Sequence, residues 1–291
     1  MAFRIALTAD LHYGTRHATG RQATHDLATH LKANPPDLLI LAGDIGVSDD
    51  FARCLALFES LPCPKACVPG NHDIWVNEDD ARGDSLAVYR DYLPQVCREH
   101  GFHYLDQSPL VVADAKLTVV GNMNWYDYSW GIEYLPPLAD DWEERLRTKR
   151  FLRGKHNDAN FVRWPFDDTE FTRECVTTME RHLNETSGPT IVVTHHPPFR
   201  QLNWPRTGPR TLDGTLWECF SGNDAMETLL ASHAERIPFA FCGHTHKERA
   251  EEYAGIRGHN IGGDYHFKRL LELDWPAGTV SALEFHGEGI S

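Results

Sequence analysis

Short runs of apolar residues alternate along this chain with longer amphipathic stretches, and the two patterns predict different elements. Six runs are too short for helices and are rich in β-formers or bounded by Gly and Pro, so we interpret them as buried strands. These runs are Ile5–Ala9, Leu38–Ala42, Ala66–Pro69, Leu117–Gly121, Ile191–Thr194 and Phe239–Cys242.

Apolar residues at helical spacing lie between these runs. The pattern predicts helices around Leu27 and Leu31, from Phe51 to Leu61, from Leu86 to Val96, from Phe171 to Leu183 and from Met226 to His233. Strands that alternate with helices indicate a layered α/β fold. Near the C-terminus, Leu270–Leu273 and Val280–Phe285 are predicted to be paired strands that close a sheet.

The stretch from about residue 122 to residue 168 has no clear period but is crowded with aromatic side chains. They are Trp125, Tyr126, Tyr128, Trp130, Tyr134, Trp142 and Trp164. Long irregular segments inside compact domains often act as lids or binding loops. An aromatic satellite core beneath an insertion is the alternative, and the sequence leaves both interpretations open.

Composition narrows the class of protein. Of the 291 residues, 41% are hydrophobic and 24% are charged, with a formal net charge of −14. This acidity argues against a surface that grips extended nucleic acid, although a small phosphate ester can still bind in a cleft that holds cations. The seven cysteines have no repeated spacing, the N-terminus has no secretory pattern and no apolar run could span a bilayer. We therefore expect a reduced, cytoplasmic setting and no membrane partner.

Each of five predicted strands is followed at once by residues that can bind metals or transfer protons. The groups are Asp10-Leu11-His12, Gly43-Asp44, Gly70-Asn71-His72-Asp73, His195-His196 and Gly243-His244-Thr245-His246. In open α/β sheets the functional crevice lies beyond the carboxyl ends of the strands. If these strands share a sheet and a direction, five separate pieces of chain bring their polar side chains to one place.

Carboxylate, imidazole and amide oxygen together suit first-row ions such as Mn, Fe, Co, Ni or Zn. The set contains no thiolate, which argues against a structural zinc site. A carboxylate can bridge two cations, and a pair of cations can hold a phosphoryl group together with the attacking oxygen. The pattern therefore favours a two-metal hydrolytic site.

In this order, the five groups resemble the motif blocks of the calcineurin-like metallophosphoesterase family. The resemblance implies an α/β fold, a four-layer α/β/β/α sandwich of two mixed sheets with flanking helices. Residues 1–291 would form one metallophosphoesterase domain, with residues 122–168 as an insertion or cap. The resemblance further implies two divalent or mixed-valence ions, Mn²⁺ or Fe in first place and Zn²⁺, Ni²⁺ or Co²⁺ as alternatives.

Matching positions in the family blocks assign a role to each residue. One ion would be held by Asp10, His12 and His246, the other by Asn71, His195 and His244, and Asp44 would bridge them. His72 would be the catalytic imidazole, and Asn71 and His72 would contact the substrate. His196 is left as a residue that supports the ligands.

The reaction we expect is in-line attack of a metal-bound hydroxide on a small phosphodiester, nucleotide-like or of another kind. A phosphomonoesterase or pyrophosphatase is the first alternative, with cationic side chains over the site from Arg163, Arg200, Arg206 or Arg210. A nuclease and a non-catalytic scaffold that keeps the fold are further alternatives. The oligomeric state is left open.

At one position the sequence departs from the family pattern. Many relatives carry an acid there, and that acid orients the catalytic histidine. Val47 stands at that position, so Asp49, Asp50 and Asp73 are the candidates for this role. Ser48 replaces an arginine of the protein Ser/Thr phosphatases, which argues against a protein phosphatase.

Overall fold

A computed structural model describes residues 2–287 of the chain, and its first sheet has six strands. They are β1 (Phe3–Thr8), β2 (Leu38–Ala42), β3 (Lys65–Val68), β4 (His103–Tyr104), β11 (Lys268–Trp275) and β12 (Thr279–Phe285). The spatial order is β12-β11-β1-β2-β3-β4. Strands β1 to β4 are parallel, whereas β11 runs antiparallel to β1 and β12 antiparallel to β11.

The second sheet also has six strands, in the order β5-β6-β7-β8-β10-β9. They are β5 (Leu110–Val112), β6 (Leu117–Asn122), β7 (Thr190–Thr194), β8 (Phe239–Cys242), β9 (Arg249–Tyr253) and β10 (Ile256–Asn260). The four central strands are parallel, and antiparallel β5 and β9 form the two edges. Both sheets are therefore mixed.

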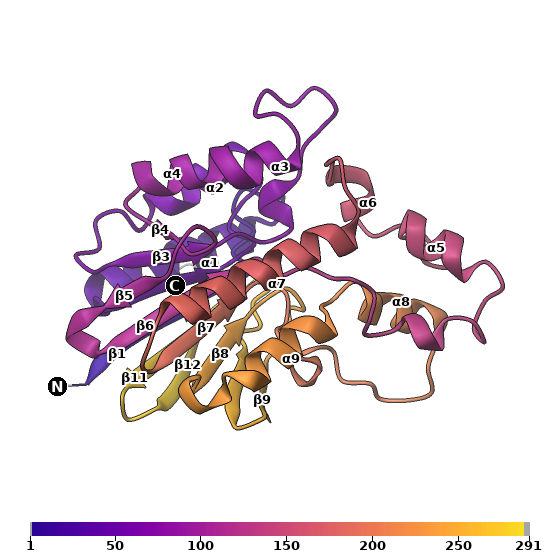
Figure 1. Cartoon of the computed structure of the whole chain (residues 1–291). Helices are drawn as coiled ribbons and strands as arrows, with labels where there is room; N and C mark the ends of the chain where they lie inside the picture. The colour runs from indigo at the N-terminus through magenta and orange to yellow at the C-terminus, as the bar shows by residue number, and fades with distance from the viewer. Residues whose placement is uncertain (1, 288–291) are drawn as a thin grey trace.

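Helices cover the outer face of each sheet. Buried residues of α1 (Ala18–Ala33), α2 (Asp49–Ala56) and α4 (Leu93–Glu99) pack with the outward-facing residues of the first sheet. Those of α7 (Asp168–Glu185) and α9 (Asp224–Ser232) pack on the second sheet. A separate apolar cluster fills the space between the sheets, with Ile5, Ile40 and Val68 from one side and Val119, Ile191 and Phe241 from the other. The predicted four-layer α/β/β/α sandwich is confirmed (Figure 1).

The remaining helices lie to one side of the sandwich. Figure 1 shows α5 (Trp142–Thr148), α6 (Asp158–Phe161) and α8 (Leu212–Cys219) beyond the ends of the strands. The short helix α3 (Ser85–Ala87) lies at the top of the same view, near α2 and α4. Helices α5 and α6 come from the aromatic-rich segment, and α8 comes from the loop that follows β7. These additions extend the sandwich on the side where the strands of both sheets end.

The five strands that precede the metal-capable residues do not share one sheet. Strands β1, β2 and β3 belong to the first sheet, and β7 and β8 belong to the second. The sequence could not reveal this division, because a strand buried on both faces reads as the same continuous apolar run in either sheet. The five strands nevertheless end on the same side of the sandwich, so the metal-capable side chains that follow them still come together as expected.

All seven cysteines are buried and free, as expected for small apolar side chains. Among the described residues, the structure has no helix that is long and apolar enough to cross a membrane.

The carboxyl group of Asp106, which follows β4, is buried between the layers. One of its oxygens accepts hydrogen bonds from the Tyr89 hydroxyl at 2.6 Å and from the Met123 amide at 3.0 Å. Burial raises the pKa of Asp106 from its ordinary value of 3.8 to about 7, against the opposing effect of these hydrogen bonds. The folded protein therefore binds this proton more tightly than the unfolded chain does.

This raised pKa gives a test of folding stability. Between about pH 4 and pH 7 the Asp106 carboxyl makes the free energy of unfolding fall as pH rises, by up to about 1.4 kcal/mol per pH unit. In the Asp106→Asn variant we expect that contribution to vanish, so the slope becomes shallower. Urea titrations at several pH values measure this directly. An unchanged slope would show that Asp106 is not protonated in the folded protein.

Candidate active site

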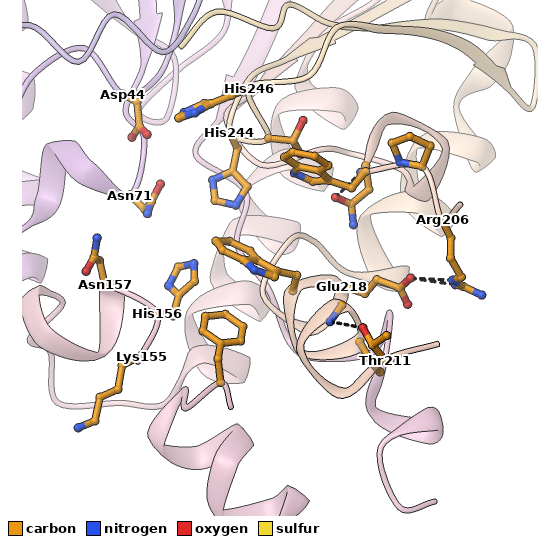
Figure 2. Close-up of a pocket in the computed structure, with 18 of the residues that line it drawn as sticks. Asp44, Asn71, Lys155, His156, Asn157, Arg206, Thr211, Glu218, His244 and His246 are labelled. Carbon is orange, nitrogen blue, oxygen red and sulfur yellow. Dashed lines mark hydrogen bonds and ion pairs between the residues drawn. The ribbon is translucent and has the colours of Figure 1, made fainter. Parts of the chain in front are cut away.

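The predicted ligand residues follow the carboxyl ends of five strands, and four of them line one cavity, with the buried Asp10, His12 and His195 beside them. Asp10 and His12 follow β1, Asp44 follows β2, Asn71 follows β3, His195 follows β7, and His244 and His246 follow β8. Figure 2 shows Asp44, Asn71, His244 and His246 gathered at one end of that cavity. The turns that end these strands therefore bring side chains from both sheets together.

The backbone is held in an unusual conformation at most of these residues. Asp10, His12, Asp44, His244 and His246 all have φ angles between 41° and 72°, the left-handed region that non-glycine residues rarely adopt. Such strain persists where the surrounding structure enforces it, and it is typical of functional sites. The conformation turns each side chain inward immediately after its strand ends.

Glycine at position 70 makes the close approach of β2 and β3 possible. A Cβ atom on Gly70 would overlap both the backbone and the carboxylate of Asp44. The next residue, Asn71, can therefore lie beside Asp44, and the His72 backbone N–H donates to Asp44 Oδ1 at 2.9 Å. Glycine at this position thus sets the spacing between two of the predicted ligands.

One cluster consists of Asp10, His12, Asp44 and His246, whose candidate ligand atoms all lie within 4.8 Å of one another. The Nε2 atoms of His12 and His246 are 2.9 Å apart. His12 Nε2 lies 3.6 Å from Asp44 Oδ2, and His246 Nε2 lies 3.6 Å from Asp10 Oδ1. Two carboxylates and two imidazoles therefore converge on a space the size of one ion.

A second cluster lies on the other side of Asp44. His195 Nε2 is 3.2 Å from Asn71 Oδ1 and 3.4 Å from Asp44 Oδ1. The His244 ring completes this cluster, with its centroid 5.2 Å from that of His195. Because Asp44 directs one oxygen toward each cluster, it stands where a bridging ligand would.

Two buried atoms of the first cluster are without a hydrogen-bond partner among the described residues. They are Asp10 Oδ2 and His12 Nδ1. Within residues 2–287, the ion-pair partners of the buried Asp10 and Asp44 carboxylates are all histidines. Buried charge normally requires a partner of opposite sign. The donor atoms and their unmet charge therefore fit divalent cations.

The protonation states of His12, His244 and Asp44 suit metal binding, whereas His195 must first lose a proton. Burial alone would lower the pKa of His195, but the Asp44 carboxylate raises it to about 9. Burial holds the pKa values of His12 and His244 well below the ordinary value for histidine, so both rings are neutral, as a ligand must be. Burial alone would raise the pKa of Asp44, but the facing His195 imidazole, which gives the largest opposing effect, helps to hold it well below its usual range. Asp44 is therefore ionised and available to bridge.

Hydrogen bonds to the backbone orient the adjacent histidines after β7. His195 Nδ1 donates to the Ala42 carbonyl at 3.0 Å, which leaves Nε2 directed at Asn71 and Asp44. His196 Nδ1 donates to the Asn124 carbonyl at 3.0 Å, and the His196 ring lies 4.0 Å from that of His244. His196 thus packs against a predicted ligand, and its own Nε2 atom is buried without a hydrogen-bond partner among the described residues. Its role as a residue that supports the ligands stays a prediction.

His72, the predicted catalytic residue, lines the cavity beside Asp44, with 3.8 Å between Nε2 and Asp44 Oδ2. Its ring stacks on the indole of Trp75, with centroids 3.6 Å apart and an angle of 25° between the planes. Asp73 does not orient this ring, because its two oxygens accept from the backbone N–H groups of Gly46 and Gly70, both at 2.8 Å. Asp50 instead pairs with Arg53, and Asp49 is exposed.

The cavity extends from the ligand clusters into a space of about 660 Å³, and part of its wall is aromatic. Phe151 and Trp217 stack in this wall, with ring centroids 5.1 Å apart. Trp204 also lines the cavity and is 52% exposed. The aromatic extension was not predicted at this place, because Trp204 and Trp217 lie outside residues 122–168.

Residues 122–168 divide between the two roles that the sequence left open. Trp125, Tyr126 and Trp130 are at most 1% exposed and belong to the packed interior. The later part of the segment instead contributes Phe151, Lys155, His156 and Asn157 to the cavity wall. Sequence analysis missed His156 and Asp158, although Lys155-His156-Asn157-Asp158 is a dense polar run within an otherwise aromatic stretch.

Tyr265 is another cavity residue that sequence analysis missed. Its ring stacks on His12 with centroids 4.3 Å apart, and it meets His246 edge to face at 5.1 Å. It thus covers two predicted ligands of the first cluster. The loop after β10 carried no metal-capable pattern that would have drawn attention to it.

Of the four arginines proposed to contact phosphate, only two line this cavity. Arg206 and Arg210 both pair with Glu218, Arg206 at 2.9 Å and Arg210 at 2.5 Å (Figure 2 shows the Arg206 pair). Arg200 pairs with Asp224 at 2.6 Å, and Arg163 lies 3.5 Å from Glu78. Among the described cavity residues, Lys155 is the cationic side chain without a salt bridge.

Comparison with known proteins bears on the family and on the fold. The family model described as calcineurin-like phosphoesterase matches residues 3–248. An [acyl-carrier-protein] phosphodiesterase from Mycobacterium tuberculosis, PptH, is 28% identical over 286 residues, which cover 92% of this chain and 80% of the relative.

Solved structures show the same fold. The crystal structure of the M. tuberculosis phosphopantetheinyl hydrolase PptH superposes with a TM-score of 0.71 at 23% identity, covering 91% of each chain. A dimetal phosphatase from Danio rerio superposes with a TM-score of 0.53 at 14% identity, covering 99% of each chain. At these identities the structural likeness establishes the fold.

Proposed function

This chain belongs to the calcineurin-like phosphoesterase family, and from that premise we propose that it is a metal-dependent phosphodiesterase with a small, largely uncharged substrate arm. Membership makes it a hydrolase of phosphate esters that works with metal ions. The observation that carries the finer proposal is the single cavity in which two ligand clusters open directly onto an aromatic wall.

We assign the two clusters to two ions. Asp10, His12 and His246 would hold one, Asn71, His195 and His244 the other, and Asp44 would bridge them. When bound, the ions supply the Lewis acidity that activates water and offsets charge on the phosphoryl oxygens. Mn²⁺ and Fe suit this oxygen and nitrogen donor set, as do Zn²⁺, Ni²⁺ and Co²⁺.

His72 and Asn71 then act on the substrate itself. The His72 ring lies at the cavity wall, close to Asp44, and its position suits a proton donor to the leaving oxygen. The neighbouring Asn71 amide would contact the phosphoryl group with the N–H hydrogen that its bond to Asp158 leaves free. Neither role needs a protein nucleophile, so we expect no covalent phosphoenzyme.

The cavity wall favours a diester over a monoester or a pyrophosphate. Arg206 and Arg210 share Glu218, which offsets one of their two positive charges and holds both guanidinium groups against a carboxylate. Phe151, Trp204 and Trp217 offer apolar surface to a flexible arm attached to the phosphoryl group. Lys155 is the feature that keeps a phosphomonoester as the alternative substrate.

The relative PptH supports the same substrate class. Its names describe a phosphodiesterase of acyl carrier protein and a phosphopantetheinyl hydrolase. A phosphopantetheinyl group is an uncharged arm on a phosphodiester, and such an arm suits the aromatic extension of this cavity. We therefore include a phosphopantetheinyl carrier protein among the substrates to be tested.

The Mn²⁺-loaded protein should hydrolyse bis(4-nitrophenyl) phosphate faster than 4-nitrophenyl phosphate, and chelation should abolish both activities. With an acyl carrier protein that bears a phosphopantetheinyl group, release of the arm is expected. Trp217→Ala should raise KM for that substrate by about tenfold, equivalent to about 1.4 kcal/mol of lost contact, with little effect on the nitrophenyl diester.

Two results would decide against this proposal. Faster turnover of the monoester would select the phosphomonoesterase alternative. Full metal loading without turnover of any ester would favour a scaffold that keeps the fold.

A further inference from the structure

Asp158 lies at the centre of a buried hydrogen-bond network behind the proposed active site. It is the first residue of α6 and is 1% exposed. Its Oδ1 accepts from Asn71 Nδ2 and from Trp75 Nε1, both at 2.9 Å. Its Oδ2 accepts from the Tyr126 hydroxyl at 2.9 Å and lies 3.2 Å from His156 Nδ1. A single carboxylate therefore joins residues 122–168 to the turn that follows β3.

His156 closes this network on the side of the cavity. The Asp158 backbone N–H donates to His156 Nδ1 at 3.4 Å, and the same ring nitrogen lies 3.2 Å from Asp158 Oδ2. Figure 2 shows His156 with Asn71 and Asn157 on the same part of the cavity wall.

The hydrogen bond from Asn71 fixes which atom of its amide can meet a metal. Because Nδ2 donates to Asp158, the carbonyl oxygen Oδ1 points the other way, to 3.2 Å from His195 Nε2. Without that acceptor the amide could rotate by half a turn and present its NH₂ group to the metal cluster. Asp158 thus determines the ligand atom that Asn71 offers.

The hydrogen bond from Trp75 acts on the catalytic imidazole. Trp75 is the residue that stacks on His72, and its indole N–H is tied to the same Asp158 oxygen. The acid that orients this histidine in many family members is absent here, where Val47 occupies the position. Among the described residues, the Trp75 ring is the side chain in closest stacking contact with His72.

We propose that Asp158 is the positioning residue of this active site, which sets the Asn71 amide and the Trp75–His72 stack through one carboxylate. It acts through these residues and does not itself contact the substrate. Asp158 and the turn that carries it are then a structural part of the catalytic machinery, whereas a cap would only cover it. This inference rests on the proposed function where it is tested by kcat. The Mn²⁺ affinity and the Trp75 indole N–H resonance can be measured without any turnover.

The test compares Asp158→Asn with Asp168→Asn as the matched control. Asp168 is also a buried carboxylate at the edge of the same segment, and it accepts from Trp125 Nε1 at 2.8 Å and from the Tyr128 hydroxyl. In Asp158→Asn we expect Mn²⁺ affinity, measured by calorimetry, to fall by about 10- to 100-fold, the usual effect of losing a residue that orients a ligand. The Trp75 indole N–H resonance should also shift.

In Asp168→Asn, Mn²⁺ affinity should change less than about twofold, although the melting temperature falls. Equal losses of affinity in both variants, or unchanged affinity in a folded Asp158→Asn, would overturn the proposal. If no ester is turned over by the wild type, the proposed function fails while the affinity and the indole resonance still test Asp158.

Trp75→Phe keeps an aromatic ring against His72 but removes the N–H donor to Asp158. This second variant tests the proposal if Asp158→Asn does not fold. We expect Mn²⁺ affinity to stay near the wild-type value and kcat to fall by about tenfold for diesters with poor leaving groups, with a smaller loss for nitrophenyl diesters. An equal effect on all leaving groups would show that Trp75 has only a structural role.

Discussion

Asp44→Asn should lose both metal ions and, with them, phosphodiester turnover by about 10³-fold or more. The reason is that Asp44 is shared. Its Oδ2 lies 3.6 Å from His12 Nε2 and its Oδ1 lies 3.4 Å from His195 Nε2, so one carboxylate reaches both ligand clusters. Asparagine keeps the shape but has one oxygen and no charge to offset two cations. Elemental analysis of the purified variant and Mn²⁺ calorimetry measure the loss.

Asp49→Asn is the control for this substitution. Asp49 is exposed in the first turn of α2, a few residues further along the same loop, and pairs with neither cluster. Its metal content and kcat should match those of the wild type. An Asp44→Asn protein that retained two ions would show that Asp44 does not bridge them, and the two-cluster assignment would have to be replaced.

His72→Ala should retain both ions but lower kcat by about 10²- to 10⁴-fold, the usual contribution of a general acid or base. His72 faces the cavity and belongs to neither ligand cluster, so its removal leaves the metal donors in place. The loss should be greatest for diesters with poor leaving groups, because those alkoxides most need a proton. Measurements of kcat across a series of substituted phenyl and alkyl esters test this dependence.

His100→Ala removes a histidine that pairs with Glu59 away from the cavity, and it should leave kcat unchanged. A similar loss in kcat for all leaving groups in His72→Ala would argue that His72 only binds the phosphoryl group. Loss of metal from His72→Ala would instead make it a ligand, contrary to the role proposed here.

Residues 122–168 illustrate why pattern alone could not choose between a lid and a satellite core. Aromatic side chains serve either purpose, and the choice depends on what surrounds them. In the fold, Trp125 is buried and its indole bonds to Asp168, whereas Phe151 faces the cavity and stacks on Trp217 of α8. The partner that gives Phe151 its role lies more than 60 residues away in the sequence.

The position of the orienting group for His72 shows the same limit. Acids near Asp44 in the sequence were reasonable candidates for orienting His72. The two carboxylate oxygens of Asp73, however, accept hydrogen bonds from the backbone N–H groups of Gly46 and Gly70. The neighbouring Trp75 provides the contact, and it depends on Asp158 from a distant segment. No sequence spacing predicts that His72, Trp75 and Asp158 interact, because side-chain contacts between distant segments join them at the turn after β3.

The sequence by itself determined the alternation of strands and helices and the order of the metal-capable groups, because short apolar runs and the residues that end them are local features. The four-layer fold was implied by the resemblance of those groups to the family. Only the tertiary structure decided that β1, β2 and β3 lie in one sheet and β7 and β8 in the other. It also decided that His156, Asp158, Trp217 and Tyr265 join the site. The physical reason is that a strand's pattern records burial but not its neighbours, whereas the shape and charge of a cavity depend on which distant side chains meet there.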